Sequence, residues 1–240
     1  MKREVYEIAG VTVEICSFYE KIHQLCREYR SSGAPELTIC VTQSHLETER
    51  KMASKQALVC EDDYLETLAV HRILAEHLLE RNILLFHGSA VAVDGVAYLF
   101  TAPSGTGKST HTRLWREQFG SRAVMVNDDK PLLKITDQEV LVFGSPWNGK
   151  HHLSSNISVP LKAICLLNRG MENQIAPITV AEALPVLLRQ CFCPKNRRGL
   201  LLSTDLLDHL IKQVKLYRLD CNMNPEAALV SYQTMCRDES

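Results

Sequence analysis

Residues 102–110, with the sequence A-P-S-G-T-G-K-S-T, carry the residue types of a phosphate-binding loop. An apolar run at residues 96–100 leads into this segment, and a helix-compatible stretch at residues 110–119 follows it. Glycines let backbone N–H groups turn toward one anion, the N-terminus of the following helix adds positive dipole, and the Lys108 ammonium can reach the terminal phosphates. Ala102 stands where the usual pattern has its first glycine. The sequence therefore predicts a nucleoside triphosphate site.

The nucleotide is expected to contact seven consecutive residues of this loop. These nucleotide-binding residues are Ser104, Gly105, Thr106, Gly107, Lys108, Ser109 and Thr110. The Ser109 hydroxyl would also bind the Mg²⁺ that accompanies the nucleotide, since magnesium takes oxygen ligands. We expect ATP with Mg²⁺ as the cofactor. Mn²⁺ could replace Mg²⁺, and the sequence does not separate ATP from GTP.

Two adjacent acids, Asp128 and Asp129, follow the apolar run at residues 123–127. They lie about twenty residues beyond Lys108, where a metal-binding carboxylate is expected after a phosphate-binding loop. One acid can hold the metal while the other accepts a proton from an attacking hydroxyl. A helix cap or a solvated turn is the ordinary role of such residues, but their place after the loop favours the functional one.

His87 lies in the first arm of a predicted hairpin. Residues 83–93 and 96–101 are apolar and flank Asp94-Gly95, a strong hairpin signal. Pairing across this turn makes Val93 and Val96 neighbours, which brings His87 close to residue 102 and the phosphates. A histidine in an apolar strand is usually a core residue, but this placement favours a role in the site.

The run from His87 to Thr110, H-G-S-A-V-A-V-D-G-V-A-Y-L-F-T-A-P-S-G-T-G-K-S-T, followed by V-N-D-D, resembles the catalytic domain of HPr kinase/phosphorylase. It is also similar to the nucleotide-binding part of ATP-dependent phosphoenolpyruvate carboxykinase. Both families carry a histidine on a strand before the loop, this type of loop, and a pair of aspartates after a short strand. The resemblance covers residues 83–170. It implies a phosphoryl transferase in which Asp128 is the base and Asp129 a metal ligand, with His87 near the metal or the transferring phosphate.

The departures from these families concern the acceptor. The chain lacks the extra lobe of a carboxykinase, its N-terminal part differs from that of HPr kinase, and the later glycine-rich segment linked to phosphorolysis is absent. It looks most like the shorter HPr-kinase-related proteins, some of which phosphorylate a free amino acid or a peptide hydroxyl. We therefore expect transfer of the γ-phosphoryl group to a hydroxyl of a small molecule, such as a hydroxy amino acid, or of a Ser-containing peptide.

Residues 144–152, G-S-P-W-N-G-K-H-H, form a second candidate segment. Proline, asparagine and glycine predict a loop, and Lys150 could neutralise charge on the γ-phosphate or the substrate. His151 or His152 could contact substrate, although neither is assigned a role. Arg169 and Arg189 are other candidate phosphate partners, although a surface position is the expected one for each.

The elements that position these residues alternate between strands and helices. Strands are expected at residues 6–16, 37–41, 83–93, 96–101, 123–127, 132–135, 140–143, 162–167 and 216–220. Helices are expected at residues 18–29, 64–81, 110–119, 180–190 and 204–214, the last capped by Ser203, and from Pro225 onward. This pattern is α/β. The resemblance implies a mixed-sheet P-loop core at 61–240, preceded by a small N-terminal α/β lobe at 1–60.

Composition sets the limits on partners and surroundings. The net charge of −1 provides no electrostatic footprint for nucleic acid or an anionic membrane, and no run is long enough to span a membrane. The start of the chain has no signal-peptide pattern, and the nine scattered cysteines contain no C-x-x-C pair. We expect a cytoplasmic protein, and a homo-oligomer is compatible with the sequence.

Two other classes of function remain open beside a kinase. A nucleotide-hydrolysing switch would need no acceptor, and the N-K-x-D guanine motif of a GTPase switch is absent. A non-catalytic nucleotide sensor would not require a second carboxylate beside the metal ligand.

Overall fold

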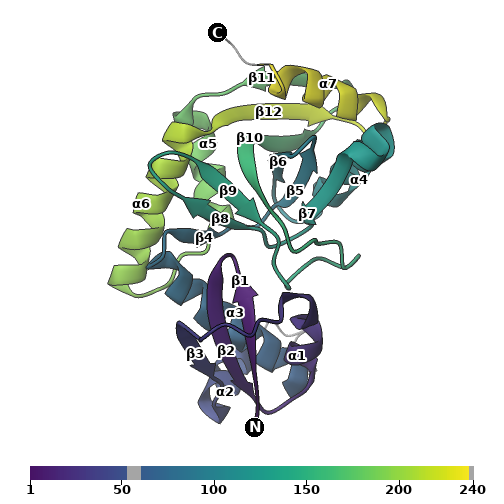
Figure 1. The fold of residues 1–240 in the computed structure, drawn as a ribbon. Coiled ribbons are helices and arrows are strands. Elements are labelled where there is room, and N and C mark those ends of the chain that lie inside the picture. The colour runs from purple at the N-terminus through teal and green to yellow at the C-terminus, as the bar shows by residue number, and fades with distance from the viewer. Residues whose placement is uncertain (53–60, 238–240) are drawn as a thin grey trace. The chain divides into compact units, whose positions relative to one another are not determined.

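A computed structural model describes residues 1–52 and 61–237 (Figure 1). The chain divides into two compact units, residues 1–78 and 79–240. The sequence placed this boundary after residue 60. Residues 53–60, which include Cys60 and the predicted end of the N-terminal lobe, lie outside the described residues.

The N-terminal unit is built on a three-stranded sheet of β1 (Lys2–Ile8), β2 (Val11–Ser17) and β3 (Leu37–Cys40). β1 and β2 pair antiparallel, and β3 pairs parallel with β2. The single strand predicted at 6–16 is wrong, because Ala9 and Gly10 adopt φ values of 53° and 76° and turn the chain back. Apolar residues alternate at even positions before the turn (Tyr6, Ile8) and at odd positions after it (Val11, Val13, Ile15), and the single-strand prediction did not take account of this shift in phase.

The helical segments in the described part of this unit are α1 (Lys21–Leu25), η1 (Arg27–Tyr29), α2 (Gln43–Met52) and α3 (Asp62–Leu79). α3 belongs here because its buried Glu66 accepts hydrogen bonds from the backbone N–H groups of Phe18 and Tyr19, at 2.6 and 3.0 Å. Arg72 of α3 also donates to Glu49 of α2 at 2.6 Å. These contacts explain why the division falls at the end of α3. α2 lies where the sequence showed no clear period.

The second unit contains a nine-stranded mixed sheet. Its strands are β4 (Ile83–Leu85), β5 (Ser89–Val93), β6 (Val96–Thr101), β7 (Ala123–Asn127), β8 (Leu132–Ile135), β9 (Val140–Phe143), β10 (Ser158–Arg169), β11 (Gln174–Pro177) and β12 (Lys215–Cys221). The main order is β4-β8-β9-β10-β6-β5-β7, and β12 pairs with β10 and β11. β10 pairs antiparallel with β9 near its start and parallel with β6 and β12 further along. The expected α/β class with a mixed sheet is confirmed.

The hairpin that feeds the phosphate-binding loop is confirmed. Val93 pairs with Val96, and Asp94 and Gly95 adopt φ values of 52° and 81°. The preceding predicted strand is divided into β4 and β5, because β4 pairs with β8 instead of β6. At the break, a Cβ on Gly88 would come within 2.8 Å of Leu99 and 3.0 Å of the Phe100 carbonyl oxygen, so the chain passes over β6 only without a side chain.

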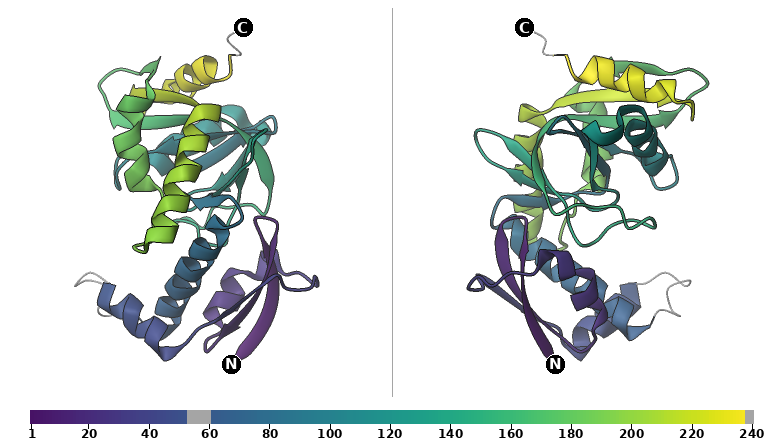
Figure 2. Two further views of the ribbon diagram at one scale, coloured as in Figure 1. Left: turned by 90° about the vertical axis from the view of Figure 1, so that its left-hand side faces the viewer. Right: turned by 45° about the vertical axis from the view of Figure 1, so that its right-hand side comes forward.

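Helices pack on both faces of this sheet (Figures 1 and 2). They are α4 (Lys108–Phe119), with the short η3 (Gly120–Arg122) after it, α5 (Val180–Gln190), α6 (Arg197–Gln213) and α7 (Glu226–Met235). The Ser203 cap is a wrong prediction. α6 begins earlier, where the Asn196 side chain accepts the Gly199 N–H at 2.7 Å, and Ser203 is buried inside the helix.

Alternate residues of β6 enter two separate cores. Ala97 and Leu99 lie in a cluster with residues of α5 and α6, whereas Tyr98 and Phe100 lie in a cluster with Trp115 of α4. Burial on both faces fixes β6 at the centre of the unit, and the phosphate-binding loop follows directly from its end.

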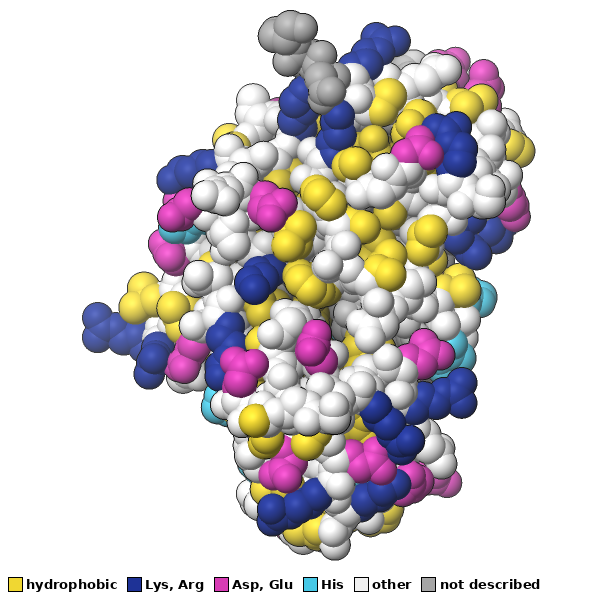
Figure 3. All heavy atoms as spheres, viewed as in Figure 1, with side chains coloured by type: hydrophobic (Ala, Val, Ile, Leu, Met, Phe, Trp, Pro, Cys, Tyr) yellow, Lys and Arg dark blue, Asp and Glu magenta, His cyan; other side chains and the backbone are white. Residues whose placement is uncertain are grey.

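On the face in Figure 3, acidic and basic side chains are interspersed without a large patch of one sign. Within residues 1–52 and 61–237, no helix has the length and apolar character needed to cross a membrane.

Candidate functional site

Residues 102–107, the predicted phosphate-binding loop, connect β6 to α4. Gly105 and Gly107 have φ values of 79° and 123°, a backbone conformation that residues with a side chain rarely adopt. α4 begins at Lys108, so its free N–H groups face the end of the loop. Ala102 is buried and has no left-handed φ, which explains why alanine is acceptable where the usual pattern has glycine.

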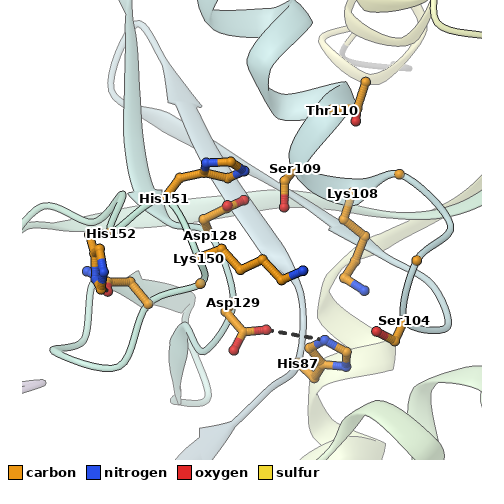
Figure 4. A pocket seen from close by; sticks show the side chains of 14 residues that line it. His87, Ser104, Lys108, Ser109, Thr110, Asp128, Asp129, Lys150, His151 and His152 are labelled. Carbon is orange, nitrogen blue, oxygen red and sulfur yellow. Dashed lines mark hydrogen bonds and ion pairs between the residues drawn. The ribbon is translucent and has the colours of Figure 1, made fainter.

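A cavity of about 650 Å³ opens beside this loop (Figure 4). Its walls come from the loop, from the segments after β4 and β7, and from the predicted loop at 144–152. Of the predicted site residues, the following line it: His87, Ser104, Gly105, Gly107, Lys108, Ser109, Thr110, Asp128, Asp129 and Lys150. Thr106 does not, and it lies against neighbouring hollows instead. Asn148, Gly149, His151 and His152 complete the lining.

Asp128 has one carboxylate oxygen in a hydrogen bond and one without a partner in the described part of the chain. Its Oδ1 accepts the Ser89 hydroxyl at 2.7 Å, and Ser89 lies 2.8 Å from the Thr112 hydroxyl of α4. Its Oδ2 is buried without a hydrogen-bond partner among the described residues. Leaving a buried carboxylate oxygen unpaired costs free energy, so this atom is suited to a cation or a proton donor that enters the cavity.

Asp129 forms an ion pair with His87. Its Oδ1 lies 3.3 Å from Nε2 of His87, and its Oδ2 lies 3.8 Å from the Lys130 ammonium. Burial by itself would raise the pKa of Asp129, but the His87 hydrogen bond and the charge of Lys130 hold it below the usual value. The other His87 ring nitrogen, Nδ1, lies 2.6 Å from Oε1 of the buried Gln190. Both nitrogens of His87 are therefore occupied.

Lys108 is a buried cation directed at the loop. Its Nζ donates to the Ala102 carbonyl at 2.9 Å, and Lys108 is only 8% exposed. Burial lowers the pKa of Lys108, and the charge of Asp129 partly opposes this shift. An anion in the cavity would stabilise the charged form of Lys108, which burial disfavours.

Asn127 fixes the segment that carries both aspartates. Its Oδ1 accepts the backbone N–H groups of Asp129 and Lys130, at 2.9 and 2.6 Å. Its Nδ2 contacts the carbonyl oxygens of Ser145 and Trp147, at 3.1 and 3.2 Å. A single fully buried side chain therefore links the aspartate turn to the loop after β9.

That loop is held against β7. A Cβ on Gly144 would lie 1.9 Å from the Ser155 carbonyl oxygen, so the chain approaches closely only with glycine here. Lys150, His151 and His152 are exposed residues on the wall of the cavity. Figure 4 shows the Lys150 ammonium directed into the space between Asp129 and Lys108.

The two arginines differ. Arg169, at the end of β10, donates to the Gly105 carbonyl at 2.6 Å and contacts the Thr106 carbonyl at 3.5 Å. It therefore holds the phosphate-binding loop, which the sequence did not reveal. Arg189 is exposed on α5 and does not line the cavity.

Sequence reasoning missed Asn127, Ser89 and Gln190. Asn127 and Ser89 lie inside the motif that was recognised, as a polar residue before the acids and one beside His87. Gln190 is distant in sequence and reaches His87 because the segment after α5 pairs with the end of β4, where Phe86 bridges to Cys191.

A metal ion in this cavity would have only one or two protein carboxylates as ligands. In the described part of the chain, no group of three or more His, Cys, Asp or Glu side chains could hold a metal ion. The unpaired oxygen of Asp128 and the Ser109 hydroxyl still fit Mg²⁺, which usually binds few protein oxygens and completes its shell with phosphate and water. The eight described cysteines are free thiols.

Comparison with known proteins identifies a family. The family described as SynChlorMet cassette protein ScmC matches residues 58–223, which include every residue of the site. The chain belongs to this family. No curated protein matches the chain.

One solved structure with similarity to this chain is the Hpr(Ser) kinase/phosphatase from Coxiella burnetii. It is 14% identical, and the match covers 53% of this chain and 91% of that chain with a TM-score of 0.27. The likeness is distant, so the function of this family member has to be inferred from the geometry of its site.

Proposed function

We propose that this protein is a nucleotide-dependent kinase that transfers the γ-phosphoryl group of ATP to a hydroxyl group. The observation that carries the proposal is the unpaired, buried Oδ2 of Asp128 in the same cavity as the phosphate-binding loop, Lys108 and the Asp129–His87 pair. Phosphoryl transfer relies mainly on positioning and charge neutralisation, and these groups provide both.

The geometry favours Asp128 and Ser109 as the residues that would hold Mg²⁺. In Figure 4 the Asp128 carboxylate and the Ser109 hydroxyl face the same space, whereas Asp129 faces His87. Mg²⁺ would supply positive charge to the β- and γ-phosphates. Asp129, oriented by His87, is then the residue placed to accept the proton of the attacking hydroxyl. The resemblance implied the opposite roles for the two aspartates.

The cations of the cavity have separate tasks in this proposal. Lys108 binds the β- and γ-phosphates from the loop side. Lys150 approaches from the opposite wall, where it neutralises charge on the transferred phosphoryl group or the acceptor. The acceptor is a small molecule or a peptide, and it enters beside His151 and His152, which are exposed at the cavity wall.

The test is a phosphate-transfer screen with Mg-ATP over hydroxy amino acids, sugars, polyols and Ser-containing peptides. Lys108→Ala and Asp129→Asn should each lower kcat/KM by about a hundredfold or more, because each removes a group that acts on the transferred phosphate or the attacking hydroxyl. Lys195→Ala is the matched control, since Lys195 is exposed and lies outside the cavity.

Three results would contradict the proposal. Full activity in both site variants would remove these residues from the mechanism. Rapid ATP hydrolysis that no acceptor changes would indicate a nucleotide-hydrolysing switch, and tight binding without turnover would indicate a sensor. The assignment of the aspartates is tested separately, because Asp128→Asn should raise the Mg²⁺ concentration needed for half-maximal activity and Asp129→Asn should not.

A further inference from the structure

A second cavity of about 430 Å³ adjoins the first at the phosphate-binding loop. The two cavities share Gly105, Gly107 and Thr110. A ligand whose phosphates lie over the loop can therefore continue past Thr110 into the second cavity. Its volume is within the range of small-molecule sites.

The walls of this second cavity are largely apolar. Leu114 of α4 and Leu167 of β10 are both buried and form part of the lining. Met223 lies at the mouth, since it lines the cavity while 76% exposed. Side chains of this kind favour a flat, apolar surface such as the face of a heterocyclic base.

His111, which contributes to the lining of this cavity, has a buried ring nitrogen without a hydrogen-bond partner in residues 1–52 and 61–237. His111 is 2% exposed, and burial lowers the pKa of His111 to about 3, which keeps the ring neutral at physiological pH. Its Nε2 lies 3.1 Å from both Trp115 Nε1 and the Ser231 hydroxyl, whereas its Nδ1 has no hydrogen-bond partner among the described residues. A ligand with ring nitrogens or hydroxyls could supply that partner, which a purely aliphatic ligand could not.

Arg169 stands where the two cavities meet. Its guanidinium is held by the Gly105 carbonyl, and it also lines the second cavity. A planar cation fixed in this way can stack on a base or contact the phosphate nearest to the ribose. The loop and the second cavity are thus tied together by one side chain.

We propose that the second cavity binds the nucleoside part of the nucleotide, with the base against Leu114, Leu167 and Met223. This inference rests on the proposed binding of the triphosphate at the loop. It assigns a site to the part of the ligand that the phosphate-binding loop itself does not contact.

The test compares the affinity of the full chain for Mg-ATP and for Mg-tripolyphosphate, which has the phosphates without the nucleoside. ATP should bind at least about tenfold more tightly. Met223→Ala should weaken ATP binding about three- to tenfold and leave tripolyphosphate binding unchanged, because it removes contact area only at the mouth of the second cavity. Met171→Ala is the matched control, since Met171 is 93% exposed and lines neither cavity.

A second measurement does not depend on a variant. Cys221 lines the second cavity and is partly buried, whereas Cys40 is exposed in the N-terminal unit. ATP should slow alkylation of Cys221 by N-ethylmaleimide and leave Cys40 unaffected, and tripolyphosphate should protect neither.

The outcomes separate the two proposals. If tripolyphosphate does not bind at all, the loop is not a phosphate site and the proposed function fails. If tripolyphosphate binds as tightly as ATP, or if ATP neither responds to Met223→Ala nor protects Cys221, the phosphate site stands and the nucleoside assignment is overturned.

Discussion

Replacing Asn127 by alanine should damage both the stability and the activity of this protein. The Asn127 side chain is fully buried and accepts two backbone N–H groups, those of Asp129 and Lys130. It also donates to two carbonyl groups of the loop after β9. Alanine leaves these backbone groups without their partner and leaves a cavity that water fills only in part.

The magnitude follows from the number of groups left unpaired. A buried donor or acceptor without a partner costs about 1–3 kcal/mol, and partial hydration lowers the sum over four groups to about 3–5 kcal/mol. The aspartate turn would also shift relative to the phosphate-binding loop. A displacement of about 1 Å at a reacting group lowers the rate about a hundredfold, so kcat/KM should fall by that order.

Urea unfolding and steady-state kinetics measure these two effects. Gln213→Ala is the control for stability, because Gln213 makes one exposed side-chain hydrogen bond to the Thr136 carbonyl, and its loss should cost about 0.5–1 kcal/mol at most. If the free energy of unfolding of Asn127→Ala lies within about 1 kcal/mol of the wild-type value and its kcat/KM within a factor of ten, the role given to this residue is refuted.

Three further predictions concern the charged groups of the site. Lys108→Met should abolish nucleotide binding, as calorimetry would show, and should leave the unbound protein at least as stable as the wild type. Burial lowers the pKa of Lys108, so the wild type, unlike the variant, should gain stability as the pH rises through that lowered pKa toward 10.5. His87→Ala should raise the lowered pKa of Asp129 toward or above 3.8, so the variant should lose less stability than the wild type when the pH falls below 3.8, as melting curves would show. Gln190→Leu should lower kcat about tenfold and shift its pH profile, whereas Gln190→Glu keeps an oxygen for His87 Nδ1 and should retain most activity; equal losses in both variants would count against a positioning role.

The local elements of the second unit follow from local sequence. The Asp94-Gly95 turn, β7, β8, β9 and α5 lie where the sequence predicts them, because each has a turn, a cap or a short apolar run of its own. The start of α6 did not follow from local sequence, because asparagine and serine are both good N-caps: Asn196 caps α6, seven residues before the predicted cap at Ser203.

The N-terminal unit was harder to predict because its signals are weak. The Ala9-Gly10 turn appears in the sequence only as a shift in phase between two short alternating runs, and α2 carries few apolar residues. α3 was recognised as a helix, but only its contacts with Phe18, Tyr19 and Glu49 assign it to the first unit.

The sequence by itself determined the residue types on which the proposed chemistry rests: a glycine-rich loop before a helix, a lysine, a serine and a pair of acids are typical of a site for a polyphosphate with its metal. The tertiary structure decided which partner each group has. Gln190 reaches His87, Arg169 holds Gly105, and Asp128 keeps one oxygen unpaired. Such pairings join residues up to about a hundred positions apart, and they depend on strand order and packing, which no local pattern encodes.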